Sequence, residues 1–149
     1  MIVDASVLLH VFLPDEIQPN ALGLVRDHVS GRIKLKAPSL LPYELSNAVW
    51  QAERRGRINR NQADRLIQAF ADLDIGIFHQ SWGETLPLAR QFGRSVYDAA
   101  YLTLAGQLGE PFITADLRLY NAVHPDLDWV LWIEDYPADS LAVNLAERG

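Results

Sequence analysis

The sequence predicts a single α/β domain, a three-layer α/β/α sandwich around a parallel sheet of roughly five strands. Strand and helix signals alternate along all 149 residues, and parallel neighbouring strands need crossover connections that place helices on both faces of a sheet. An apolar content of 49% is enough for one well-cored domain, whereas the length is too short for two comfortable ones. We expect this domain to span residues 1–132 and to be followed by a tail, residues 133–149.

Five short apolar runs are the predicted strands, at residues 2–4, 34–37, 75–78, 111–114 and 129–132. Helical spacing of apolar residues and helix-ending residues predict the helices between them. These helices are 5–12, 20–30, a segment between Ser39 and Gly56, 59–73, 81–92, 96–108 and 117–123. Ser39 and Ser95 are the expected N-caps of two of them, and either Asn59 or Asn61 caps a third.

The tail holds two acidic clusters and a weak apolar rhythm through Leu141, Val143 and Leu145. Both a terminal helix and a partner-binding arm fit that pattern.

Charge and composition exclude several classes of function. A net charge of -6 argues against a general, charge-driven nucleic-acid binder, so any nucleic-acid contact must be local. The absence of cysteine excludes disulfide frameworks, zinc-thiolate sites and thiol nucleophiles. A strand that begins at the second residue leaves no room for a signal peptide, and no run approaches the roughly 20 apolar residues of a membrane span. We therefore expect a soluble, cytoplasmic protein.

Four acidic residues fall where ligands bind in such folds. Asp4 ends the first strand and Asp116 lies two residues past the fourth, at the carboxyl ends where open α/β sheets bind ligands. Glu44 and Asp98 lie in the first turns of strongly apolar helices, where a carboxylate would be largely buried. Burial costs a carboxylate several kcal/mol unless it is paired or binds a metal. We see no cation near either residue in the sequence to pair with it.

Each acid also has a simpler explanation. Asp98 follows Ser95 by three residues, as a capping-box partner does, and Asp116 is positioned to cap the helix after it. The negative charge of Glu44, near the start of its helix, interacts favourably with the helix dipole. Asp4 is the hardest to explain in this way, because strands disfavour aspartate and its neighbours are apolar. Each acid alone is weak evidence for a site, but all four predicted positions can reach one rim of the sheet.

Carboxylates gathered in one cleft repel one another, and a divalent cation with oxygen ligands relieves that repulsion. Mg²⁺ or Mn²⁺ is the natural choice, as one ion or two. Such ions polarise a phosphodiester and activate water. The four acids therefore predict phosphodiester hydrolysis.

The motifs around these acids resemble the PIN-domain signature. They are Ile-Val-Asp4-Ala-Ser6, Pro-Tyr-Glu44-Leu-Ser-Asn47, Ser-Val-Tyr-Asp98-Ala-Ala-Tyr and Thr114-Ala-Asp116-Leu-Arg-Leu. The similarity covers residues 2 to about 132, and within the family the length resembles the VapC-type toxins of toxin–antitoxin pairs. The order and spacing of the motifs are more specific than any single one of them.

This resemblance implies a Mg²⁺- or Mn²⁺-dependent endoribonuclease that forms a homodimer and is held inactive by a small antitoxin protein. It also implies that the four acids bind the metal and catalyse cleavage. Ser6, Asn47 and Thr114 would support them. The resemblance does not explain the tail.

Arginines gather at the end of the Glu44 helix and the start of the next one, as Arg54, Arg55, Arg57, Arg60 and Arg65. In an acidic protein this cluster is the best candidate for contact with substrate phosphates, chiefly through the first four. A solvated helical hairpin with arginines near a helix C-terminus explains it equally well.

Other protein classes that have an acidic pocket fit this sequence less well. A receiver domain needs a lysine late in the chain, but the two lysines are Lys34 and Lys36. A haloacid-dehalogenase-type phosphatase needs a second aspartate where Ser6 stands. An RNase H-like nuclease has a hairpin after its first strand, whereas here a helix follows. A solitary RNA-processing nuclease and a catalytically silent PIN-like binding module remain as alternatives.

Overall fold

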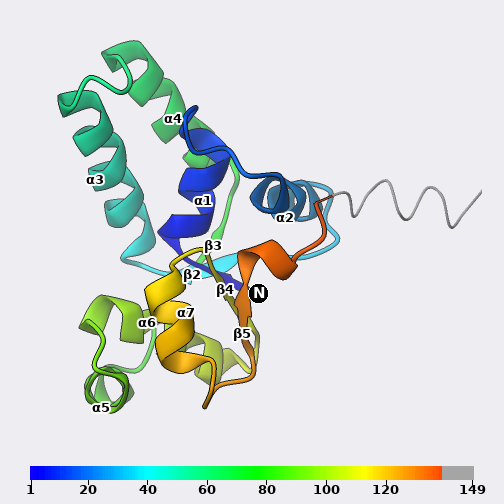
Figure 1. The fold of residues 1–149 in the computed structure, drawn as a ribbon, viewed down its shortest axis with the longest axis vertical. Helices are drawn as coiled ribbons and strands as arrows, with labels where there is room; N and C mark the ends of the chain where they lie inside the picture. Colours follow the sequence, from blue (N-terminus) through cyan, green and yellow to red (C-terminus); the bar gives the residue numbers. More distant parts are fainter. Residues whose placement is uncertain (139–149) are drawn as a thin grey trace, which may run out of the picture.

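The computed structural model describes residues 1–138 and contains a five-stranded parallel sheet (Figure 1). The strand order is β3-β2-β1-β4-β5. The strands are β1 (Ile2–Val3), β2 (Lys36–Pro38), β3 (Gly76–Phe78), β4 (Phe112–Thr114) and β5 (Val130–Trp132). Strand β1 is central, and Ile2 and Val3 are completely buried. The predicted number of strands and their parallel arrangement are confirmed.

Seven α-helices and one 3-10 helix complete the described part of the chain. They are α1 (Ala5–Phe12), α2 (Pro19–Val29), α3 (Leu41–Arg54), α4 (Arg60–Asp72), α5 (Trp82–Phe92), α6 (Val96–Leu108), α7 (Leu117–Val123) and η1 (Ile133–Asp135). The predicted boundaries agree closely with these. None of the described helices is long and apolar enough to cross a membrane.

Helix caps account for two of these boundaries, and one predicted cap is wrong. Asn59 caps α4 in a full capping box with Gln62, and Ser95 caps α6. Ser39 does not cap α3, because the N-cap position is taken by Leu40 without a side-chain hydrogen bond. Pro42 lies in the first turn of α3 and has no N–H to satisfy, which reduces the need for a capping side chain.

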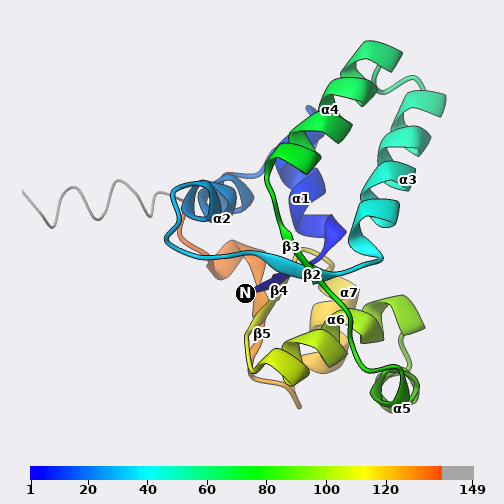
Figure 2. The same ribbon diagram turned by 180° about the vertical axis from the view of Figure 1, so that it is seen from behind.

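The helices lie on opposite sides of the sheet (Figures 1 and 2). Helices α1 to α4 lie on one side, and α5 to α7 lie on the other. The chain moves from β1 outward through β2 to β3 and then returns to β4 on the far side of β1. The topological switch point therefore lies between β1 and β4, where open α/β sheets bind their ligands.

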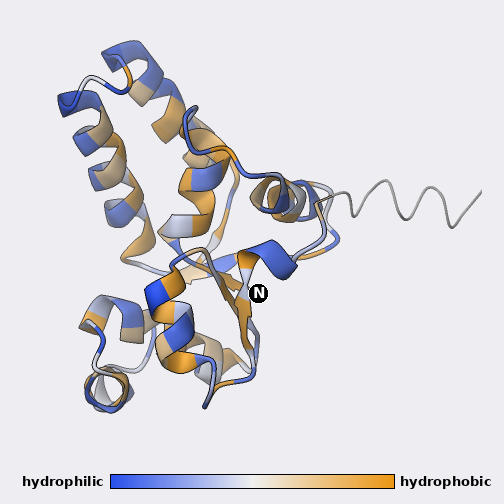
Figure 3. Ribbon diagram, viewed as in Figure 1, coloured by the Kyte–Doolittle hydropathy of each residue, from blue (hydrophilic) through white to orange (hydrophobic). Residues whose placement is uncertain are grey.

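Helices α3 and α4 form a hairpin that extends away from the sheet (Figures 1 and 2). Their facing surfaces pack with α1 around a small second core of Leu13, Val49, Ala52, Ile58 and Ala63. Figure 3 shows hydrophobic residues along the strands and hydrophilic residues at the far end of the hairpin. The hairpin is thus a polar extension with its own apolar seam.

The described start of the tail packs against α2. Ile133 is buried in the main core, and the Asn20 side-chain amide donates to the Tyr136 carbonyl oxygen at 2.7 Å. The Tyr136 hydroxyl donates to Asp27 of α2. These contacts attach the described start of the tail to the main core and to α2. The remainder, including the apolar rhythm from Leu141 to Leu145, lies outside the described residues, and its role stays a prediction.

Candidate active site

The two strand-end acids lie side by side at the switch point. Strands β1 and β4 are hydrogen-bonded neighbours, with Val3 opposite Ile113. Asp4 follows β1 as the N-cap of α1, and Asp116 follows β4 as the N-cap of α7. The expectation that these strand ends would be adjacent depended on the strands being neighbours, and they are.

Asp4 is buried and held on both of its carboxylate oxygens. The Ser6 hydroxyl donates to Oδ1 at 2.5 Å, and the Thr114 hydroxyl donates to Oδ2 at 2.6 Å. The Val7 N–H also donates to Oδ1, at 3.3 Å. Burial nevertheless raises the pKa of Asp4 from 3.8 to about 6, because the three hydrogen bonds only partly offset the loss of hydration and the nearby charge of Glu44 opposes ionisation.

Ser6 and Thr114 also join the loops that follow β1 and β4. The Ser6 hydroxyl accepts from the Ala115 N–H at 2.9 Å, and the Thr114 hydroxyl accepts from the Asp116 N–H at 3.0 Å. The two hydroxyls therefore fix the loop that carries Asp116 against the loop that carries Asp4. These contacts are compatible with the supporting role that the resemblance implies for them.

Asn47 differs from these two side chains. It lies three residues after Glu44 on α3 and is exposed, and among residues 1–138 no hydrogen bond joins it to any of the four acids. Its supporting role stays a prediction.

Glu44 lies in the first turn of α3 and contacts Tyr101, the last residue of the Asp98 motif, for which no role was predicted. The hydroxyl of Tyr101, which is buried on α6, donates to Glu44 Oε1 at 2.7 Å. Burial raises the pKa of Glu44, the Tyr101 hydrogen bond lowers it, and the charge of Asp98 raises it further. Tyr101 therefore connects the Glu44 helix to the Asp98 helix.

Asp98 has a cationic partner, which corrects the expectation that none is near in sequence. Arg94 Nε donates to Asp98 Oδ2 at 3.1 Å, and Arg94 Nη2 lies 3.1 Å from the same oxygen. The capping-box alternative is only half fulfilled. The Asp98 N–H donates to Ser95 Oγ at 3.0 Å, but the Asp98 carboxylate contacts Arg94.

Asp116 combines the capping role with a place in the cluster. Its Oδ1 accepts from the Leu119 N–H at 3.1 Å, which confirms that it caps α7. Its Oδ2 lies 3.8 Å from Arg94 Nη2. One carboxylate oxygen of Asp116 therefore caps α7, while the other faces the Arg94 guanidinium, which also binds Asp98.

The four acids form an electrostatically connected series. Burial is the main cause of the raised pKa of Asp98, which the Arg94 charge lowers and the charge of Asp116 raises. The charge of Asp98 likewise raises the pKa of Glu44, and the charge of Glu44 raises the pKa of Asp4. Among residues 1–138 no three acidic or histidine side chains are already arranged to hold an ion. The structure thus brings four carboxylates to one edge with a single arginine between two of them.

A family model for the PIN domain matches residues 1–124 of this chain. The chain belongs to the PIN-domain family. Ribonuclease VapC3 of Pyrobaculum aerophilum is 30% identical to this PIN domain over 123 residues, covering 80% of this chain and 91% of that protein. Ribonuclease VapC9 of Mycobacterium tuberculosis is 29% identical over 125 residues, covering 80% of this chain and 87% of that protein.

The fold is also similar to that of a solved structure. The crystal structure of PAE2754 from Pyrobaculum aerophilum matches this PIN domain with a TM-score of 0.68 and 27% sequence identity, and covers 98% of this chain and 96% of that chain. The family resemblance inferred from the four acidic motifs is therefore confirmed.

The arginine cluster of the PIN domain lies at the far end of the α3–α4 hairpin (Figure 1). Arg57 is engaged in an ion pair, donating to both Asp15 oxygens at 2.9 and 2.7 Å. Arg54 lies over the Trp50 ring, 5.7 Å from its centroid. Arg55 and Arg60 are exposed. Arg57 is therefore less available to a phosphate than the others, and Arg54 is about 15 Å from Glu44 along the helix axis.

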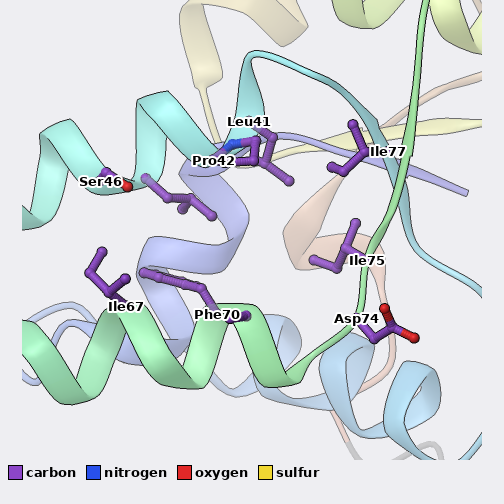
Figure 4. A pocket seen from close by; sticks show the side chains of 10 residues that line it. Leu41, Pro42, Ser46, Ile67, Phe70, Asp74, Ile75 and Ile77 are labelled. Carbon is purple, nitrogen blue, oxygen red and sulfur yellow. The ribbon is translucent and has the colours of Figure 1, made fainter.

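An apolar pocket of about 290 Å³ lies between α3, α4 and β3 (Figure 4). Leu41 and Pro42 of α3 face Ile67 and Phe70 of α4 across it, and Ile77 of the edge strand closes one side. None of the four acids lines this pocket. It is therefore separate from the candidate active site.

Proposed function

We propose that this PIN domain is a metal-dependent endoribonuclease in which Asp4, Glu44, Asp98 and Asp116 are the catalytic and metal-binding residues. The observation that carries the proposal is the series of four neighbouring carboxylates at the switch point, three of them with raised pKa values. The similarity to two proteins named ribonucleases supports RNA as the substrate.

The donor set fits Mg²⁺ or Mn²⁺, as one ion or two. These cations prefer carboxylate oxygens, and a cation among acids with raised pKa values would relieve the repulsion and desolvation that raise them. Bound there, it would supply Lewis-acid activation of a phosphodiester and of water.

Neighbouring hydroxyl groups hold Asp4 and Glu44 in position. Ser6 and Thr114 fix both oxygens of Asp4, and Tyr101 fixes one oxygen of Glu44. Such contacts hold carboxylates in orientation for a cation and lower the entropy lost when it binds. Arg54, Arg55 and Arg60 are the side chains that we propose to contact substrate phosphates, with Arg57 contributing only if it leaves Asp15.

The proposal is tested by the metal dependence of cleavage. We expect the purified chain, freed of any bound partner, to cleave single-stranded or loop RNA with Mg²⁺ or Mn²⁺ and to lose that activity when EDTA is added. Gel analysis of a labelled RNA would measure both rates. Equal cleavage with and without the chelator would show that catalysis does not use a metal.

We further propose that the chain is a homodimeric toxin of a toxin–antitoxin pair, inhibited by a small antitoxin protein. The support is the VapC name shared by the two relatives. We expect induced expression to arrest bacterial growth, and co-expression of a short reading frame immediately upstream to relieve the arrest. The Asp98→Asn variant is the control and should not arrest growth. Cleavage without arrest would instead favour a solitary RNA-processing nuclease, and partner binding without cleavage a silent binding module.

A further inference from the structure

The backbone of Arg94 is fixed next to the site because the residues before and after it cap two helices. Helix α5 ends at Phe92 and is capped by Gly93, whose positive φ of 61° is a conformation that glycine adopts at little cost. The Arg94 N–H then donates to the Ala89 carbonyl oxygen at 3.1 Å. The next residue, Ser95, is the N-cap of α6. Arg94 is therefore the middle residue of a three-residue connection between α5 and α6, and the capping residues on either side of it fix the position of its backbone.

The guanidinium lies between two of the four acids. Arg94 Nη2 is 3.1 Å from Asp98 Oδ2 and 3.8 Å from Asp116 Oδ2. Among residues 1–138, Arg94 is the one cationic residue that forms an ion pair with any of the four acids. The Asp98 and Asp116 side of the site is thus partly neutralised, while Asp4 and Glu44 are contacted by hydroxyl donors.

We propose that Arg94 is an internal counter-ion that competes with the divalent cation for Asp98 and Asp116 and so sets the affinity of the site for metal. This inference rests on the proposed function, because it takes these two acids to be metal ligands. In the metal-free protein the guanidinium offsets the repulsion between two neighbouring carboxylates. In the metal-bound protein it must give up at least part of its contact.

The competition follows from the atoms involved. At Asp116 a guanidinium and a divalent cation would share Oδ2, because Oδ1 already accepts from the Leu119 N–H. At Asp98 the guanidinium already contacts Oδ2. Two positive charges about 4 Å apart repel strongly when they are partly shielded from water. The side chains of Arg94 and Asp98 are about three-quarters buried, so solvent screens this repulsion only in part. Arg94 is therefore a positioning residue that weakens metal binding while stabilising the empty site.

Mn²⁺ binding to the metal-stripped full chain tests the proposal, by calorimetry or by electron paramagnetic resonance of free Mn²⁺. We expect Arg94→Gln to lower the Kd for Mn²⁺ by about tenfold. We also expect it to lower the melting temperature of the metal-free protein. Arg90→Gln is the matched control, because Arg90 is exposed one turn earlier on α5 and contacts none of the acids. Its Mn²⁺ affinity should equal that of the wild type.

A second measurement needs no substitution. The Nε–H resonance of Arg94 in the wild-type protein should shift as Mg²⁺ is added and should saturate together with metal binding. An unchanged resonance at saturating Mg²⁺ would overturn the proposal, and so would equal or weaker Mn²⁺ binding by Arg94→Gln. Wild-type protein that binds Mn²⁺ but cleaves no RNA would refute the proposed function alone, whereas normal cleavage with an unchanged Kd in Arg94→Gln would refute this inference alone.

Discussion

Asp4→Asn should abolish RNA cleavage and at the same time make the metal-free protein more stable at neutral pH. The first effect follows from the loss of a charged ligand, and we expect the rate to fall by about a hundredfold or more. The substitution leaves the shape of the side chain unchanged, and an asparagine can still accept from Ser6 and Val7 while its amide faces the Thr114 hydroxyl. The fold should therefore be preserved.

The second effect follows from the raised pKa of Asp4. Its value is about 6 in the folded protein and 3.8 when unperturbed, so between these values the folded state binds more protons than the unfolded state. Stability contributed by the protonated group is fully present below about pH 4 and is lost as the pH rises through 6. The difference of about two units corresponds to about 3 kcal/mol above pH 6, which an uncharged asparagine would not lose.

Thermal denaturation in EDTA from pH 4 to pH 8 measures this effect. The melting temperature of Asp4→Asn should exceed that of the wild type by several degrees at pH 8, and the two should converge near pH 4. Asp64→Asn is the control, because Asp64 is exposed on α4 and should change neither stability nor cleavage. An Asp4→Asn variant that cleaves RNA at the wild-type rate would show that Asp4 is not a catalytic metal ligand. A variant that melts below the wild type at pH 8 would show that the buried charge of Asp4 does not destabilise the metal-free protein.

Local signals explain why most of the fold and the location of the acids were predictable. Strands β1 and β4 are short, fully buried apolar runs, and Asn59 and Ser95 cap their helices through contacts within three residues. Asp4 and Asp116 could be placed because parallel strands bring their carboxyl ends to one edge. The elements and caps needed only neighbouring residues, whereas the adjacency of Asp4 and Asp116 also required β1 and β4 to be neighbouring strands, which the structure shows.

The partners of the acids were less accessible to sequence reasoning. Tyr101 is 57 residues from Glu44, and the two meet only because α6 packs on β2, the strand that directly precedes α3. Arg94 stands four residues before Asp98, a spacing that normally indicates contact within one helix. Here it precedes the Ser95 cap and lies outside α6, so the contact depends on how the connection between α5 and α6 turns.

Gly23→Ala should destabilise the protein although alanine is the better helix former. Gly23 is buried in the middle of α2, and a Cβ atom added there would clash with the Pro137 carbonyl oxygen and lie 2.9 Å from the carbonyl oxygen of Ala138. Both contacts are with backbone atoms of the segment that crosses α2. That segment is held by the Asn20 amide on the Tyr136 carbonyl and by the Tyr136 hydroxyl on Asp27, so it cannot move away without losing hydrogen bonds.

Overpacking of this kind costs about 1–3 kcal/mol, which outweighs the gain of about 1 kcal/mol that alanine brings to a helix interior. Urea denaturation of Gly23→Ala should therefore give a lower free energy of unfolding, with cleavage by the folded fraction unchanged because α2 carries none of the four acids. Gly106→Ala is the matched control on α6, where nothing lies within 4 Å of the added Cβ, and it should stabilise the protein. If both variants gained stability equally, residues 137 and 138 would not press on α2, and the folded domain would end nearer to β5, as the sequence predicted.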